Sequence, residues 1–138
     1  MSYKFLDHAT DAIIEVTAKD LKEAFSVTAD AVVNLTLDQD KVEEIEHREF
    51  SAKGKDLRYL LFSWIEEIVF VLITEGFAIK RIEFDIKEND GYKIDAKAFG
   101  ETLDFHKHNF KVEIKAPTFY DMEIKENEEV YMRFLLDL

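Results

Sequence analysis

Apolar and polar positions alternate in the first part of the chain and then change to a helical spacing. The even-numbered residues of the segment 12–18 are apolar, which predicts a strand. Asp20 follows as a candidate helix N-cap, and Glu23 stands three residues later, as in a capping box. Apolar residues then recur every three or four positions as far as Leu35, so we expect a helix that begins near residue 21.

A second helical pattern covers residues 57–75. Asp56 precedes it as a candidate N-cap, and Gly76 follows it at the position where a left-handed glycine often ends a helix. The apolar residues of this segment form two stripes, and clearly polar residues are few in its second half. We therefore expect a central helix that is covered on more than one side.

The rest of the chain alternates between apolar and polar residues in short segments that predict strands. The sequence ENDG lies between two of these segments and predicts the turn of a hairpin, and Pro117 is expected to end another strand. Besides residues 12–18, the predicted strands cover residues 46–53, 82–86, 92–98, 110–116, 122–124 and 130–138. This order predicts an α+β fold: a single-domain sandwich over residues 1–138, with two helices packed on about seven mainly antiparallel strands.

The charge of the chain limits the partners that it can bind. Its 138 residues include 30 acidic and 18 basic ones, for a formal net charge of −12. This charge repels phosphate backbones, so direct nucleic acid binding is not expected, whereas a cation or a basic protein surface would be attracted. The chain has no cysteine, which excludes disulfides and thiolate metal sites. Its apolar runs are far shorter than the roughly 20 residues of a membrane-spanning helix, so we expect a soluble cytoplasmic protein.

Several catalytic motifs are missing from the sequence. The four glycines form no phosphate-binding loop, and no serine lies in the strand–turn–helix elbow of a hydrolase. His106 and His108 are two residues apart, so on a strand both rings would point the same way and could begin a zinc site. No other histidine is near them in sequence, and we favour the interpretation that they are polar loop residues.

The C-terminal sequence FLLDL brings two negative groups to the end of an apolar strand. The side chain of Asp137 and the terminal carboxylate of Leu138 can lie close together, where their repulsion costs about 4 kcal/mol at ~4 Å and an effective dielectric constant of ~20. A hard divalent cation would make this arrangement favourable, because calcium and magnesium prefer carboxylate oxygens. Two groups are too few for a metal site, so a third carboxylate is needed.

The order and spacing of five segments resemble those of the archease family. These segments are FLDHATDA (residues 5–12), DLRYLLFSWIEEIVFVLITEG (56–76), AKAFGETLDFHKH (96–108), VEIKAPTFY (112–120) and FLLDL (134–138). The first is similar to the Asp-His-Thr-Ala-Asp signature of that family, with Ala9 and Thr10 transposed. The resemblance covers nearly the whole chain.

The resemblance implies a fold and a function. Archeases are small α+β sandwich proteins that help the tRNA-splicing ligase, which joins RNA 3′-phosphate ends to 5′-hydroxyl ends. They promote guanylylation of the ligase by GTP and so support repeated turnover and a looser choice of nucleotide. The resemblance therefore implies a non-catalytic activator whose partner is this RNA ligase.

The resemblance also implies a divalent metal, usually calcium, and the residues that bind it. Its ligands would be Asp11, Asp137 and Leu138, the last through its terminal carboxylate or carbonyl. Lys115, Asp7 and His8 match family positions that we assign to partner contact or activation. From the pattern alone, Lys115 is an outward lysine on the predicted strand 110–116, comparable with Lys111.

The sequence departs from the family at two places. Phe119 and Tyr120 stand where the family often has Tyr-His, so a role for that histidine cannot be transferred to this chain. Lys107 and His108 replace the common Arg-His after the Gly-Glu motif.

Two other functions remain open on the sequence alone. A metal-dependent hydrolase would use the same carboxylates with a metal-bound water as nucleophile, and His8 would be its candidate general base. A chaperone-like binding module would need no chemistry but would need an exposed apolar patch.

Overall fold

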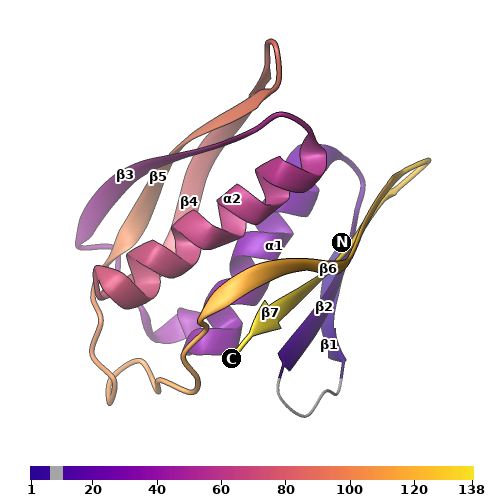
Figure 1. Cartoon of the computed structure of the whole chain (residues 1–138). Coiled ribbons are helices and arrows are strands. Elements are labelled where there is room, and N and C mark those ends of the chain that lie inside the picture. The colour runs from indigo at the N-terminus through magenta and orange to yellow at the C-terminus, as the bar shows by residue number, and fades with distance from the viewer. Residues whose placement is uncertain (7–10) are drawn as a thin grey trace.

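The computed structural model describes residues 1–6 and 11–138, which form two antiparallel sheets and two helices (Figure 1). The elements are β1 (Ser2–Leu6), β2 (Asp11–Ala18), α1 (Leu21–Thr36), a 3-10 turn (Gln39–Lys41), β3 (Glu46–Gly54), α2 (Leu57–Val69), a π-helical turn (Phe70–Thr74), β4 (Phe77–Glu88), β5 (Tyr92–Thr102), β6 (Ala116–Glu126) and β7 (Val130–Asp137). One sheet has the strand order β1-β2-β7-β6 and the other the order β3-β5-β4.

The two helices lie between the two sheets (Figure 1). α1 contacts β2 and β4, and α2 contacts β3 and β6, so each helix packs on both sheets. Trp64 of α2 is fully buried in the apolar core between these layers, and its indole N–H donates to the carbonyl oxygen of Phe25 at 3.0 Å. The predicted α+β fold is confirmed, as is a second helix that is covered on more than one side.

Both predicted helix starts are confirmed. The side chain of Asp20 accepts a hydrogen bond from the N–H of Glu23 at 2.8 Å, and the side chain of Asp56 accepts one from the N–H of Tyr59 at 3.0 Å. Each bond satisfies a backbone donor that has no partner within the helix. Within the described residues, neither helix is long and apolar enough to cross a membrane.

The end of the second helix differs in detail from the prediction. The α-helical part stops at Val69, and a π-helical turn follows, in which the N–H of Glu75 donates to the carbonyl oxygen of Phe70 at 3.0 Å. Gly76 then adopts a left-handed conformation with φ 62°, as the sequence predicted. The predicted hairpin is also confirmed as β4 and β5, although β4 begins earlier, at Phe77.

The prediction of a strand over residues 110–116 is wrong. β6 begins only at Ala116 and continues through Pro117 to Glu126, so it includes the predicted strand 122–124 but only the last residue of the predicted strand 110–116. Pro117 is tolerated because β6 is the edge strand of its sheet, where one side of the backbone needs no strand partner.

Residues 110–115 are held by other parts of the molecule instead. The N–H of Lys111 donates to the carbonyl oxygen of Thr36 at the end of α1, at 2.8 Å. Ile114 is buried, whereas Lys111 and Lys115 are exposed. The alternation that predicted a strand therefore comes from an extended segment that packs on the molecule without forming a ladder.

β1 is the strand that the sequence pattern did not indicate. It pairs with β2 from Ser2 opposite Thr17 to Leu6 opposite Ile13, and it forms the other edge of the four-stranded sheet. Five residues give too little alternation to distinguish an edge strand from a polar terminus.

Candidate functional site

The candidate site is at the end of the four-stranded sheet where β2 begins and β7 ends. Asp11 is the first residue of β2 and Asp137 is the last residue of β7, and the antiparallel register places them directly opposite each other. Residues opposite each other in such a pair have Cβ atoms about 5 Å apart. The structure thus brings together two residues that are more than a hundred positions apart in the sequence.

The apolar residues beside these aspartates decide which way the aspartates point. Ala12 and Leu136 are buried in the core, and successive residues of a strand point to opposite faces of the sheet. Asp11 and Asp137 therefore lie on the outer face, where Asp11 is half-buried and Asp137 is exposed. Among the described residues, the Asp137 carboxylate has no ion-pair partner.

Lys115 lies beside the same end of the sheet. Its backbone N–H donates to the carbonyl oxygen of Asp137 at 2.8 Å, and the next residue, Ala116, is opposite Asp137 in the ladder between β6 and β7. The side chain of Lys115 is exposed, and its ammonium forms no ion pair with the described part of the chain. The main chain of Lys115 is therefore fixed next to Asp137, while its charge remains available.

Lys111 is not comparable with Lys115, contrary to the interpretation of both as similar outward lysines. Its ammonium lies 3.0 Å from the Asp38 carboxylate and donates to the carbonyl oxygen of Asn34 at 2.9 Å. The hydrogen bond from Lys111 is the main reason why the pKa of Asp38 is lowered. Lys111 therefore attaches its segment to the end of α1.

The donors at this end of the sheet are oxygen atoms, the type of ligand that a hard divalent cation prefers. Asp11 and Asp137 offer carboxylate oxygens, and the half-buried side chain of Leu138 packs against the core and holds its main-chain oxygens next to Asp137. In the described residues, no group of three or more His, Cys, Asp or Glu side chains is placed so that it could hold a metal ion. Asp7 and His8 lie outside the described residues.

A second group of charged residues lies at the end of β5 and in the segment between β5 and β6. The sequence did not indicate that these residues contact one another. His108 is fully buried, and its Nε2 lies 3.0 Å from the carboxylate of Glu101. The Lys107 ammonium donates to the same carboxylate at 2.9 Å, and the backbone N–H of Glu43 does so at 2.9 Å. We call Glu101, Lys107 and His108 the Glu101 cluster.

The hydrogen bonds of His108 assign its tautomer. Its Nδ1 accepts a hydrogen bond from the backbone N–H of Asp104 at 3.0 Å, so in the neutral ring the proton is on Nε2, which donates to Glu101. This hydrogen bond is the largest cause that lowers the pKa of Glu101 to about 2, followed by the one from the N–H of Glu43. Both ring nitrogens are thus occupied, and His106 is exposed in the same turn. Because His108 is buried with both ring nitrogens hydrogen-bonded and His106 is exposed, the structure does not support a zinc pair.

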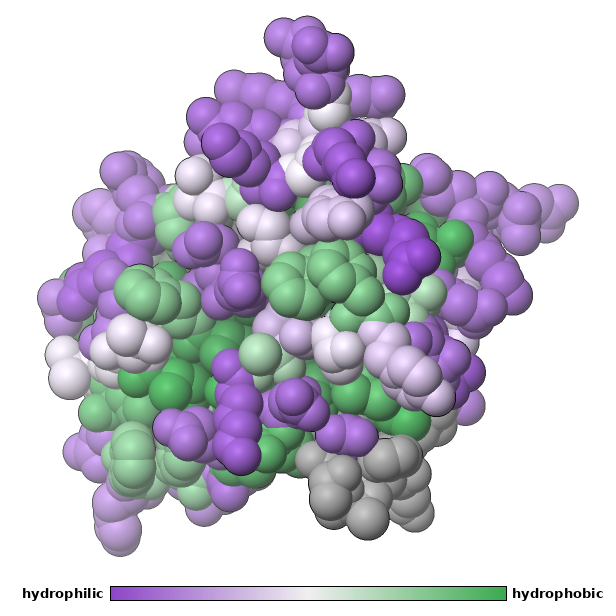
Figure 2. Space-filling model, viewed as in Figure 1, coloured by the Kyte–Doolittle hydropathy of each residue, from purple (hydrophilic) through white to green (hydrophobic). Residues whose placement is uncertain are grey.

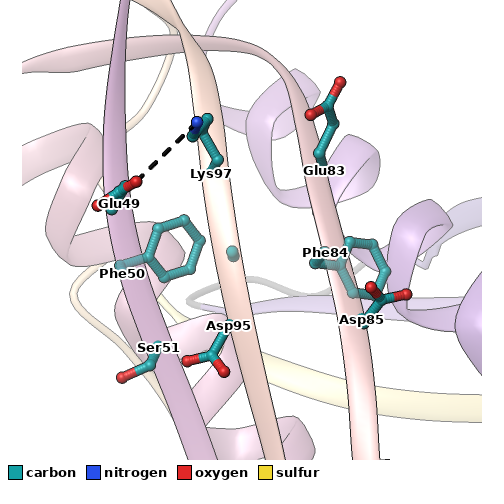
Figure 3. A pocket seen from close by; sticks show the side chains of 9 residues that line it. Glu49, Phe50, Ser51, Glu83, Phe84, Asp85, Asp95 and Lys97 are labelled. Carbon is teal, nitrogen blue, oxygen red and sulfur yellow. Dashed lines mark ion pairs between the residues drawn. The ribbon is translucent and has the colours of Figure 1, made fainter.

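The outer face of the three-stranded sheet has a hollow of about 590 Å³ that is also acidic (Figure 3). Each of the four carboxylates that line it forms an ion pair with a lysine or arginine. Glu49 lies 4.0 Å from the Lys97 ammonium, and Asp85 lies 3.1 Å from that of Lys22. The hollow is on the other sheet from Asp11 and Asp137, and none of the residues predicted for the site line it.

Comparison with known proteins identifies the family and the fold of the chain. The model of the archease protein family matches residues 3–138. An archease from Pyrobaculum islandicum is 37% identical over 141 residues, covering 100% of this chain and 96% of that protein, and an archease from Pyrococcus abyssi is 37% identical over 124 residues, covering 89% and 87%. The solution structure of protein 1598 from Methanobacterium thermoautotrophicum has a TM-score of 0.80 at 31% identity and covers 99% of both chains. The chain belongs to the archease protein family.

Proposed function

We propose that this protein is a non-catalytic activator of the RNA ligase that joins 3′-phosphate to 5′-hydroxyl ends in tRNA splicing. In this function it promotes the GTP-dependent guanylylation of the ligase and supports multiple turnover. Membership of the archease family supports a role in tRNA splicing in association with an RNA ligase.

The observation that carries the proposal is the meeting of Asp11, Asp137 and Lys115 at one end of the four-stranded sheet. Two carboxylates face each other across β2 and β7, and the backbone of the lysine is bonded to the second of them. An exposed lysine that pairs with no described residue contributes little to folding. Its place beside two carboxylates is better explained by contact with a partner.

Asp11, Asp137 and a main-chain oxygen of Leu138 would hold a divalent cation, calcium being the first candidate, because all these donors are oxygens. When bound, such a cation would neutralise the two carboxylates and attract the phosphate oxygens of a nucleotide. Asp11 and Asp137 would orient it, since their positions are fixed by the ladder between the two strands.

Lys115 would present its ammonium to the nucleotide phosphates or to the ligase itself. An ammonium is a compact charge on a flexible stem that can reach a phosphate without a fixed fork geometry. The net charge of −12 supports contact with the ligase and not with its RNA, because an acidic surface repels phosphates and attracts a basic protein.

The test is a guanylylation time course of the organism's own RNA ligase with GTP, with and without this protein. We expect a faster formation of ligase-GMP and more ligated product per ligase molecule. A parallel assay with model phosphoesters, without ligase, tests the metal-dependent hydrolase. Hydrolysis by the protein alone, with no change in ligase guanylylation, would overturn the proposal.

A further inference from the structure

The side of α2 that faces solvent is aromatic. Tyr59, Phe62, Glu66 and Phe70 follow one another at intervals of three or four residues, so they lie on one side of the helix. Tyr59 is 45% exposed and Phe70 is 47% exposed. The solvent side of a helix is usually polar, and here the exposed charged residues between these rings are Glu66 and Arg58, whose guanidinium lies 5.9 Å from the centroid of the Phe119 ring.

β6 extends this surface with two further aromatic residues. The ring of Phe119 stacks on that of Phe62, with centroids 4.3 Å apart and an angle of 9°, and lies 5.0 Å from that of Tyr59. Tyr120 is 75% exposed. Figure 2 shows hydrophobic residues gathered on this side of the molecule, along α2 and between it and β6. We call Tyr59, Phe62, Phe70, Phe119 and Tyr120 the aromatic face.

Phe119 and Tyr120 lie in an irregular part of β6, which places their side chains on the aromatic face. The register with β7 shifts between Thr118 and Glu123, and Asp121 within this stretch has φ 61°. Asp121 is bonded to Arg133 at 2.7 Å, which fixes the irregular stretch on the outer face of the sheet. Such bulges often redirect side chains next to functional sites.

The charges near the C-terminal end of α2 are not compensated within the protein. Glu66, Glu67 and Glu75 form no ion pair with any described residue, and the last turn of the helix has no basic residue. Burial, and then the nearby charges of Glu66 and Glu75, raise the pKa of Glu67. Carboxylates are also disfavoured at this end of a helix by the helix dipole.

We propose that the aromatic face is a docking surface for a protein whose own surface is basic around an apolar centre. Charge complementarity identifies this occupant, because basic side chains would compensate Glu66, Glu67 and Glu75 while apolar ones cover the rings. Resting on the function proposed above, we assign it to the RNA ligase, since an enzyme that binds RNA carries basic surfaces. A second copy of this chain would bring the same carboxylates together and is disfavoured.

The aromatic face is near the candidate site along β6. Ala116 is opposite Asp137, and Tyr120 is four residues further along β6. At most about 14 Å of extended chain therefore separates Tyr120 from Ala116. A partner that docks on the aromatic face therefore also reaches Asp137 and Lys115. Docking and activation are thus assigned to different residues of one surface.

The test is the affinity for the ligase of variants that change only exposed side chains. The double variant Phe70→Ala/Tyr120→Ala should bind at least tenfold more weakly, as expected for aromatic hot spots. Glu66→Lys should lower the association rate at least tenfold at low salt, with a smaller difference at high salt. Matched controls are Ile45→Ala, also an exposed apolar residue, and Glu128→Lys, which makes the same change of charge in the turn before β7; both should bind like the wild type.

A second pair of measurements separates this proposal from the function on which it rests. Asp137→Asn and Lys115→Ala should lower the stimulation of guanylylation far more than they lower the affinity for the ligase, whereas Phe70→Ala/Tyr120→Ala should lower the affinity itself. If the wild type stimulates the ligase and the variants of the aromatic face bind it equally well, the docking surface is wrong and the function stands. If the wild type neither binds nor stimulates the ligase, both proposals fail.

Sedimentation of the protein alone tests whether a second copy of this chain covers the aromatic face. A wild-type dimer that Phe70→Ala/Tyr120→Ala dissociates would assign the aromatic face to a second copy and overturn the proposal. Unchanged thermal melting of the double variant shows that any loss of binding comes from the surface, because both side chains are substantially exposed.

Discussion

The Glu101 cluster and the candidate site both combine carboxylates with a lysine, but they differ in how completely the charges are compensated. Glu101 accepts hydrogen bonds from His108, Lys107 and a backbone N–H. In the described residues, the carboxylate of Asp137 and the ammonium of Lys115 have no ion-pair partner. The first group is largely buried, and both Asp137 and Lys115 are exposed.

This difference separates charges that stabilise the fold from charges that are available to a partner. A buried charge must be paired, because an unpaired one costs several kcal/mol, on the order of 3–5 when a partner is removed. An exposed charge can remain unpaired at little cost in water and can bind something else. The residue types alone do not distinguish the two groups, whereas their pairing does.

Removal of His108 should have the largest effect on stability. We expect His108→Ala to lower the free energy of unfolding by about 3 kcal/mol, because it creates a cavity and leaves the Glu101 carboxylate without its main partner. Urea unfolding measures this change. His106→Ala in the same turn is the control and should change stability by less than about 0.5 kcal/mol. Equal stabilities of the two variants would contradict a structural role for the Glu101 cluster.

Calcium should stabilise the protein through the candidate site. At a concentration about 100 times its Kd, a cation that binds only the folded state raises the free energy of unfolding by about 2.7 kcal/mol. We expect this increase for the wild type and its loss for Asp137→Asn, measured by thermal melting and by calorimetric titration. Asp85→Asn, in the hollow of the other sheet, should keep the increase. If Asp137→Asn is stabilised as much as the wild type, the metal site is wrong.

Lys115 should matter for activation and hardly at all for folding. We expect Lys115→Ala to reduce the stimulation of ligase guanylylation at least tenfold, or about 1.4 kcal/mol. Its free energy of unfolding should change by no more than about 0.5 kcal/mol, because its ammonium pairs with no described residue.

Lys53 provides the matched control for Lys115. It is also exposed, its ammonium has no ion-pair partner among the described residues, and it lies on β3 in the other sheet. Lys53→Ala should stimulate the ligase like the wild type. Comparable stimulation by both variants would show that Lys115 is an ordinary surface lysine. Lys111 is unsuitable as a control because it is bonded to Asp38.

The Glu101 cluster should also make the stability of the protein depend on pH. The folded protein lowers the pKa of Glu101 from 4.5 to about 2, so its ionised form is favoured by folding. This contribution is complete above about pH 4.5 and is lost as the pH falls toward about 2, because the carboxylate is then protonated. Urea unfolding of the wild type and Glu101→Gln between these limits measures it. A stability difference that stays constant with pH would contradict the prediction.

The sequence by itself determined the helices and most strands. Alternation along β2 and β7, and the caps at Asp20 and Asp56, are local features that a short segment specifies. Prediction from the sequence failed where contacts with distant segments of the chain decide the secondary structure. Residues 110–115 have the alternation of a strand but form no ladder, because their backbone bonds to the end of α1 at Lys111 and reaches Asp137 of β7 only at Lys115.

For the candidate site, the sequence determined which residues to examine, through the resemblance of its motifs to a family. It did not determine their geometry. Asp11 and Asp137 are brought together by the pairing of β2 with β7, a contact between distant segments that no local pattern encodes. The tertiary structure also decided that Lys111 is paired while Lys115 is not, and that His108 is buried while His106 is exposed. The physical reason is that burial and pairing depend on which elements pack together, whereas residue type and periodicity depend only on the chain.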